Sequence, residues 1–118
     1  MKLPEKIKVG GHYYEIVFPY KFQEREDRAA YCDYGLNKIC ITDVDACGNK
    51  RAGSQVIVNL IHELLHAIDY TSGWNMFAVD SGEQKIEALA QGIFQVLIDN
   101  NLLKMEELYA INGKRQED

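Results

Sequence analysis

The sequence predicts an α+β domain in which a small antiparallel β-sheet, built from hairpins, packs on a buried helix and a second helix. Three observations support this prediction. Short β-rich runs separated by glycine-containing turns occupy the N-terminal third. An almost continuously apolar helix pattern follows over residues 54–70, and a second pattern with an apolar stripe covers residues 81–100. We expect residues 1–118 to form a single domain.

Two glycines separate the first pair of β-rich runs, Lys6–Val9 and His12–Phe18. Two-residue turns of this kind join antiparallel strands, and the resulting register sets Ile7 opposite Tyr14. His12 would then lie beside the turn, so we expect it at the rim rather than in a site.

A second hairpin is predicted from Ala30–Tyr34 and Lys38–Thr42, around a turn that contains Gly35. Lys38–Thr42 is our expected edge strand. The charged residues 21–28 before this hairpin predict a solvated connector, and the polar residues 43–53 after it predict a loop.

The first helix is predicted to begin at an N-cap, Ser54, and to stop before Gly73. It is apolar around most of its circumference, which predicts burial. One polar stripe breaks this pattern and must find partners inside the protein, because unpaired buried polar groups are costly. The stripe contains Gln55, Asn59, His62, His66 and Asp69.

Ser81 and Gln84 form a predicted capping box at the start of the second helix, which should reach about residue 100. The linker Trp74–Asp80 carries aromatic residues that look exposed. Leu102–Ile111 is a candidate third helix.

His62, Glu63 and His66 form an H-E-x-x-H motif within the first helix. Histidines four residues apart lie about one turn apart on one helix face, so both rings can reach one metal ion. The glutamate between them can act on a metal-activated water. A buried histidine pair bonded to its neighbours is the simpler alternative, but it leaves the polar stripe unexplained.

Catalytic zinc sites usually have three protein ligands, so one more is needed. The second helix offers Glu83 and Glu87 on one face. Glu83 lies nearer the apolar stripe, which favours it as the ligand, and Glu87 could orient a ligand histidine. The two roles could be exchanged, or both acids could serve the helix dipole. Asp69 is another candidate for orienting a histidine.

The segments H-E-L-L-H-A-I-D and E-Q-K-I-E-A-L-A-Q-G-I-F-Q-V-L-I-D-N resemble small metallopeptidase-like proteins encoded by phages and prophages. These belong near the ImmA/IrrE-like and SprT-like minimal zincins. The resemblance covers about residues 38–100 and implies a zincin-like domain of gluzincin type, with Zn²⁺ as its cofactor. In that type the ligand glutamate precedes, by four residues, an acid that orients a zinc histidine. Glu83 and Glu87 match this spacing. The resemblance does not extend to the helix-turn-helix domain that some relatives carry.

Metal-assisted hydrolysis of a protein or peptide substrate is the expected function, with Glu63 as general base. An edge strand could hold the substrate, and Tyr13, Tyr34 and Tyr70 are candidates for stabilising the oxyanion. The main alternative is a catalytically silent, metal-binding phage regulatory or interaction protein. A helical interaction module without metal is a third hypothesis, and the oligomeric state is open.

Composition narrows the partners and the compartment. A net charge of −5 and the absence of a basic stripe disfavour nucleic-acid binding. No apolar run reaches membrane-spanning length, and the N-terminus lacks a signal-peptide core. The three cysteines, Cys32, Cys40 and Cys47, cannot form a full disulfide framework, so we expect free thiols in a cytoplasmic protein.

Overall fold

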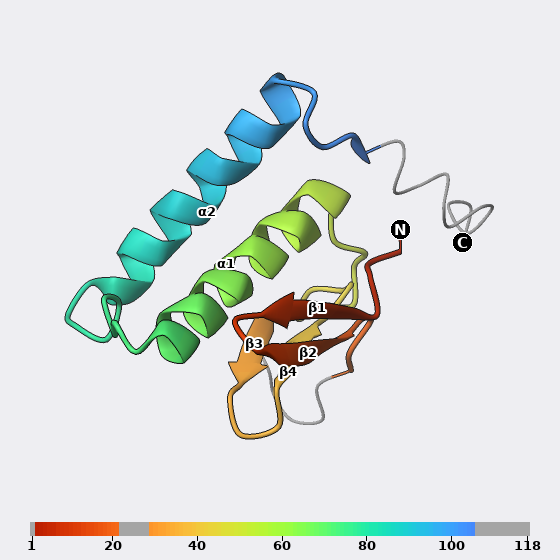
Figure 1. The fold of residues 1–118 in the computed structure, drawn as a ribbon. Coiled ribbons are helices and arrows are strands. Elements are labelled where there is room, and N and C mark those ends of the chain that lie inside the picture. Colours follow the sequence, from red (N-terminus) through yellow and green to blue (C-terminus); the bar gives the residue numbers. More distant parts are fainter. Residues whose placement is uncertain (1, 22–28, 106–118) are drawn as a thin grey trace.

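Four strands form one sheet in the computed structural model, which describes residues 2–21 and 29–105. Its strand order is β1-β2-β4-β3 (Figure 1). The chain order of the elements is four strands followed by two helices. These are β1 (Lys6–Val9), β2 (His12–Val17), β3 (Ala30–Asp33), β4 (Lys38–Ile41), α1 (Gly53–Ser72) and α2 (Gly82–Asp99).

The α+β class is confirmed, but the expected antiparallel sheet is wrong in one respect. β1 pairs with β2 and β3 with β4 in the antiparallel sense, as the turns predicted. β2 and β4 are parallel, so the sheet is mixed. A hairpin pattern fixes pairing within each hairpin, because the turn does so. It does not determine which strand of the second hairpin joins the first.

The strand order also corrects the expected edge. β4 lies between β2 and β3, so Lys38–Thr42 is an interior strand. β3 is the outer strand on that side of the sheet in the described part of the chain. A peptide that pairs with this edge of the sheet would therefore contact Ala30–Asp33 rather than Lys38–Thr42.

The predicted register is confirmed, since Ile7 pairs with Tyr14 and Val9 with His12. Alternation along each strand turns one set of side chains toward α1, and these make the core. The core set from the sheet is Val9, Tyr14, Ile16, Ile39 and Ile41, and the helix adds Val56, Ile57, Leu60 and Ala67.

α1 lies between the sheet and α2, so the fold has three layers (Figure 1). Its N-cap is Ala52 rather than the expected Ser54, and Gly73 ends it in the left-handed conformation (φ 78°), as predicted. Burial all around the helix is wrong, because the sheet and α2 cover only two of its faces. Ile68, on an uncovered side, is 50% exposed.

α2 packs on α1 through Ile86 and Ala90, which are fully buried. Ser81 is its N-cap but adopts a left-handed conformation (φ 67°) without a side-chain cap, so the capping box is wrong. Leu102–Lys104 are not helical. The remainder of the predicted third helix beyond Met105, and residues 22–28 of the predicted connector, lie outside the described residues. None of the helices that the structure describes has the length and apolarity to cross a membrane.

Candidate metal centre

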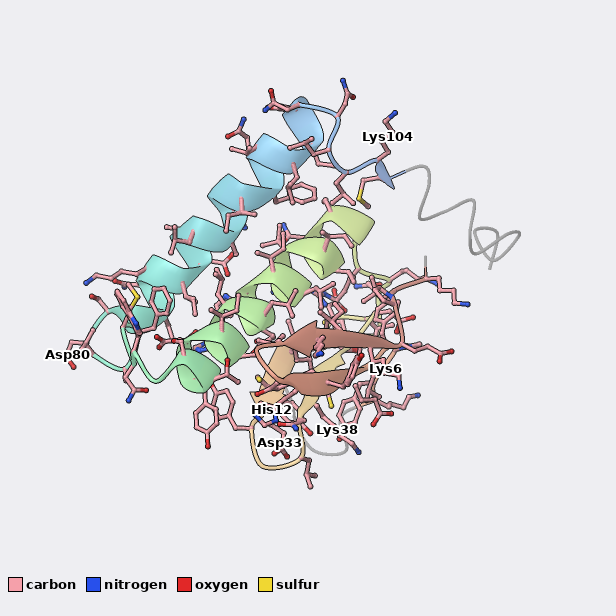
Figure 2. All side chains as sticks on the ribbon, in the orientation of Figure 1. Lys6, His12, Asp33, Lys38, Asp80 and Lys104 are labelled. Carbon is pink, nitrogen blue, oxygen red and sulfur yellow. The ribbon has the colours of Figure 1, made fainter. Side chains whose placement is uncertain are left out.

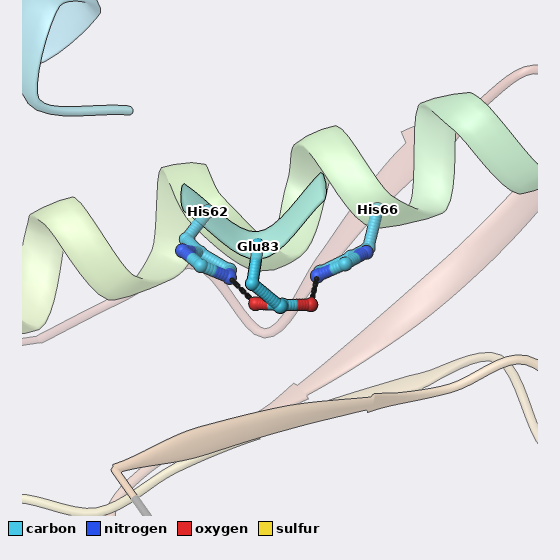
Figure 3. A group of neighbouring side chains, drawn as sticks. All are labelled: His62, His66 and Glu83. Carbon is cyan, nitrogen blue, oxygen red and sulfur yellow. Dashed lines mark hydrogen bonds and ion pairs between the residues drawn. The ribbon is translucent and has the colours of Figure 1, made fainter. Parts of the chain in front are cut away.

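Two helices bring His62, His66 and Glu83 together (Figure 3). The histidines lie one turn apart on α1, and Glu83 stands in the first turn of α2, where the linker returns the chain beside them. One Glu83 oxygen lies 2.9 Å from His62 Nε2 and the other 2.8 Å from His66 Nε2. The Glu83 side chain is 71% exposed, whereas the rings are only 12% and 18% exposed. The group is therefore open to solvent from the glutamate side.

Glu87, one turn further along α2, approaches the other nitrogen of the same ring. Its Oε1 lies 2.7 Å from His62 Nδ1, and its Oε2 accepts a hydrogen bond from Gln91. A neutral imidazole carries one N–H and cannot donate at both nitrogens. Both nitrogens of His62 nevertheless face carboxylates. A neutral ring therefore donates to one carboxylate and presents a lone pair to the other, an arrangement that a cation between the two groups would stabilise.

The donor set fits Zn²⁺. Two imidazole nitrogens and one carboxylate are a common catalytic ligand set, and one ligand atom of each lies within 4.8 Å of the others. Zinc bonds of about 2.0–2.2 Å in tetrahedral geometry put neighbouring ligand atoms roughly 3.3 Å apart. The observed separations of 2.8 and 2.9 Å are slightly shorter, so a small outward movement of the exposed Glu83 carboxylate would accommodate the ion.

Glu63 lies beside this group and is buried, with 7% of its surface exposed. It belongs to the wall of an open pocket of about 460 Å³ that lies between α1, the start of α2 and the outer strand β3. The lining residues are Ala30, Tyr31, Cys32, Tyr34, Glu63, His66 and Glu83. The motif glutamate and two of the grouped residues therefore share one cavity.

Two other groups in the pocket are held in their neutral forms. Burial, and then the neighbouring Cys32 and Glu63, raise the pKa of Tyr34 to about 12. Burial, and then the charge of Glu63, raise the pKa of the Cys32 thiol to about 12. Both side chains therefore present an uncharged hydrogen-bonding group beside Glu63 at neutral pH.

Asp69 does not orient a histidine in the described structure, contrary to our expectation. Its two carboxylate oxygens accept hydrogen bonds from the backbone N–H groups of Met76 and Phe77, at 2.7 and 3.0 Å. Asp69 lies near the end of α1, beside the linker that leads back to α2. The N–H groups of this linker are close enough to bond to both of its oxygens. It fixes the linker that leads to Glu83.

Asn59, another residue of the polar stripe, has its partner in the loop before α1. Its side-chain oxygen accepts a hydrogen bond from Arg51, whose guanidinium also donates to the Thr42 carbonyl at 2.7 Å. Arg51 thus ties the loop after β4 to α1. Sequence reasoning missed this residue, because the only signal was an arginine just before a helix whose polar stripe contains an asparagine.

The remaining candidates lie elsewhere. His12 is exposed, lies on the sheet at the start of β2 (Figure 2) and does not belong to the histidine–glutamate group. Tyr13 is 59% exposed between Lys6 and Lys8. The three cysteines are free, as predicted, with Cys47 exposed in the loop and Cys40 buried.

Comparisons of the chain with protein-family models, with curated proteins and with solved structures found no match. Functional inference therefore depends on the geometry of the pocket and its side chains.

Proposed function

We propose that the protein is a zinc-dependent peptide hydrolase whose metal is held by His62, His66 and Glu83. The observation that carries this proposal is that both ring nitrogens of His62 face carboxylates. A neutral His62 that donates Nδ1–H to Glu87 has a lone pair on Nε2, directed at the space shared with His66 and Glu83. A cation there would resolve the conflict. The resemblance to minimal zincins supports the same ligand set.

Each residue then has a defined task. When bound, Zn²⁺ would supply Lewis acidity, lowering the pKa of a water molecule towards about 7 and polarising the substrate carbonyl. Glu63 accepts the proton of the attacking water on its carboxylate and later delivers it to the leaving amine. Glu87 holds the His62 ring in the tautomer that leaves Nε2 unprotonated. Burial of Glu63 keeps competing solvent away from this proton transfer.

The outer strand β3 supports a peptide as substrate. Thr42 N–H donates to the Ala29 carbonyl, so Ala29 and Thr42 form a hydrogen-bonded pair next to the β3–β4 ladder. Such pairs alternate, which directs the N–H and C=O groups of Ala30 and Cys32 away from β4. Both residues line the pocket. An extended peptide could pair with this edge and carry its backbone past Glu63.

Metal content tests the site. Purified, tag-free protein is analysed by native mass spectrometry with elemental analysis, beside Glu83→Ala, Glu63→Gln and Asp99→Ala. We expect one zinc per parent chain, loss in Glu83→Ala, and retention in Glu63→Gln because that residue is a base rather than a ligand. Asp99→Ala removes an exposed acid at the far end of α2 and controls for charge. A parent that takes up no zinc when supplied with it would sink the hydrolase proposal.

Hydrolysis is tested with a degenerate fluorogenic peptide library. Zinc-loaded parent should cleave it, and Glu63→Gln should lose about a hundredfold or more of the rate while keeping the metal. Equal rates for parent and Glu63→Gln would point to a contaminant and contradict the assigned base.

A metal-binding interaction protein without hydrolase activity is the second candidate. Leu89 and Val96, seven residues apart on one face of α2, are 46% and 47% exposed, and Ile68 of α1 is 50% exposed. A partner that covers these side chains would remove their apolar surface from water. This candidate predicts zinc uptake with no cleavage of the library by parent or by Glu63→Gln.

A further inference from the structure

The three tyrosines that could stabilise an oxyanion occupy different places in the structure. Tyr34 lines the pocket with Glu63 and His66. Tyr70 follows His66 by one turn of α1, and the residue is 55% exposed. Tyr13 belongs to β2 and lies near Lys6 and Lys8, away from the pocket lining. The structure therefore distinguishes candidates that the sequence left equal.

The Tyr34 ring is held by the same helix that carries the histidines. It stacks on Tyr70 with ring centroids 4.3 Å apart and an interplanar angle of 10°. The turn that carries Tyr34 is closed by a hydrogen bond from Leu36 N–H to the Asp33 carboxylate, at 3.0 Å. Stacking covers one face of this ring, and the closed turn fixes the backbone that carries it. A phenol fixed in this way loses little entropy when it binds a ligand.

The other pocket tyrosine is already engaged. Tyr31 pairs with Cys40 across the ladder, and its hydroxyl exchanges hydrogen bonds with Cys40 and Tyr20. In residues 2–21 and 29–105, no hydrogen bond involves the Tyr34 hydroxyl. An ordinary tyrosine is protonated at neutral pH and is a hydrogen-bond donor. Tyr34 is thus the pocket tyrosine with a hydroxyl available to a ligand.

We propose that the Tyr34 hydroxyl donates a hydrogen bond to the substrate oxygen that gains negative charge during hydrolysis, with Tyr70 positioning the Tyr34 ring by stacking. The inference rests on the proposed hydrolase function and adds a catalytic residue to it. A fixed donor aimed at developing charge is worth more in the transition state than in the ground state. The proton remains on Tyr34, and no covalent bond is formed to it.

Two probes separate this role from a structural one. A phosphinic Ala–Ala dipeptide analogue has a tetrahedral phosphorus atom, and its oxygens imitate the substrate oxygen that becomes charged during hydrolysis. An Ala–Ala hydroxamate has the same side chains but a planar metal-binding group. The affinities of both for the zinc-loaded parent, Tyr34→Phe, Tyr70→Ala and Tyr13→Phe are measured by calorimetry. Phenylalanine keeps the ring, and zinc content and thermal unfolding verify that each variant is intact.

We expect Tyr34→Phe to weaken the phosphinic probe by about tenfold or more, with little change for the hydroxamate. Tyr70→Ala removes the stack and should weaken the phosphinic probe in the same sense as Tyr34→Phe, but less. Tyr13→Phe, outside the pocket lining, should match the parent. If the parent holds zinc but the ratio of the two affinities is the same in Tyr34→Phe as in the parent, the role of Tyr34 is overturned. The proposed hydrolase function would not be affected by that result. A zinc-loaded parent that binds the hydroxamate but not the phosphinic probe would likewise overturn the role of Tyr34. A parent without zinc would overturn the proposed function, and this inference with it.

Discussion

Glu87 Oε1 lies 2.7 Å from His62 Nδ1, while Glu83 meets the opposite nitrogen of the same ring. Two carboxylates one turn apart on α2 therefore hold one imidazole of α1 between them. This relationship separates the two acids by task. Glu83 also reaches His66, whereas Glu87 reaches only His62 among the two histidines. Both acids reach His62 only if α2 keeps its present orientation on α1, so this orientation determines the geometry of the site.

Replacing Glu87 by alanine should weaken zinc binding without abolishing it. The proposed ligand set stays complete, but His62 loses the carboxylate beside its Nδ1, which we propose fixes its tautomer. Removal of such a partner typically costs about 10–100-fold in metal affinity. Competition with a chromophoric chelator measures this loss. Gln91→Ala, which removes only the neighbour of Glu87, is the matched control and should change affinity less. A loss in Glu87→Ala as large as in Glu83→Ala would mean that the two roles are exchanged.

Gly82 is predicted to be essential for the placement of Glu83. A Cβ atom built on Gly82 would lie 1.9 Å from the Phe77 carbonyl oxygen and 2.8 Å from its carbon. Backbone atoms cannot yield as a flexible side chain can, so the linker or α2 must shift. Gly82→Ala should lower the free energy of unfolding by at least about 2 kcal/mol and weaken zinc binding, because Glu83 is the next residue. Urea denaturation and the chelator competition measure both effects.

Gly92 provides the matched control within the same helix. An added Cβ there meets nothing within 4 Å. Gly92→Ala should therefore raise the free energy of unfolding by about 0.5–1 kcal/mol, through helix propensity alone, and leave zinc affinity unchanged. Equal stabilities for Gly82→Ala and the parent would show that the linker tolerates a side chain at this position.

Strand pairing within each hairpin could be predicted because turn length and alternation determine it locally. Ile7 pairs with Tyr14 for this reason. The parallel contact of β2 with β4 depends on how two hairpins pack on α1, and no local pattern encodes that choice. The predictions of the two helix N-caps were also wrong. Ser54 lies inside α1, and Ser81 has a left-handed backbone that carries its side chain away from the cap.

The pairing of His62 with His66 was anticipated because residues four apart share a helix face whatever the tertiary structure. Glu83 could be anticipated because it lies near the apolar stripe by which α2 packs on α1. The fate of Asp69 was not, because a helical wheel gives the face of a residue but not its partner. Asp69 shares the polar stripe with the histidines, yet the N–H groups of Met76 and Phe77 take both of its oxygens. Tyr34 stood out only in the folded structure, because its pocket unites a turn, a strand edge and two helices.

Cys32 should make stability fall at alkaline pH. The pKa of its thiol is raised from an ordinary value of 9.0 to about 12, mainly by burial. Below about pH 9 the thiol is protonated in both the folded and unfolded states, and its full contribution is present. As pH rises from about 9 towards 12, the unfolded state loses the proton first, so this contribution is lost. Urea denaturation between pH 8 and 11 should show a shallower decline in Cys32→Ala. Cys47→Ala, at an exposed loop position, should leave the slope as in the parent.

Tyr14 provides a test of the core behind the site. Its ring is fully buried, and its hydroxyl has no hydrogen-bond partner in the described structure. A buried hydroxyl without a partner costs about 1–3 kcal/mol of desolvation, so its removal relieves a penalty. Tyr14→Phe should therefore be neutral or should raise the free energy of unfolding by up to about 2 kcal/mol, which thermal and urea unfolding can measure.

Tyr31→Phe is the matched comparison, because the Tyr31 hydroxyl is bonded to Cys40 and Tyr20. Loss of those bonds should lower the free energy of unfolding by about 1 kcal/mol. Each substitution removes one tyrosine hydroxyl from the same small sheet. The two changes in the free energy of unfolding should have opposite signs. If Tyr14→Phe instead destabilises the protein as much as Tyr31→Phe, a buried water must bond to the Tyr14 hydroxyl.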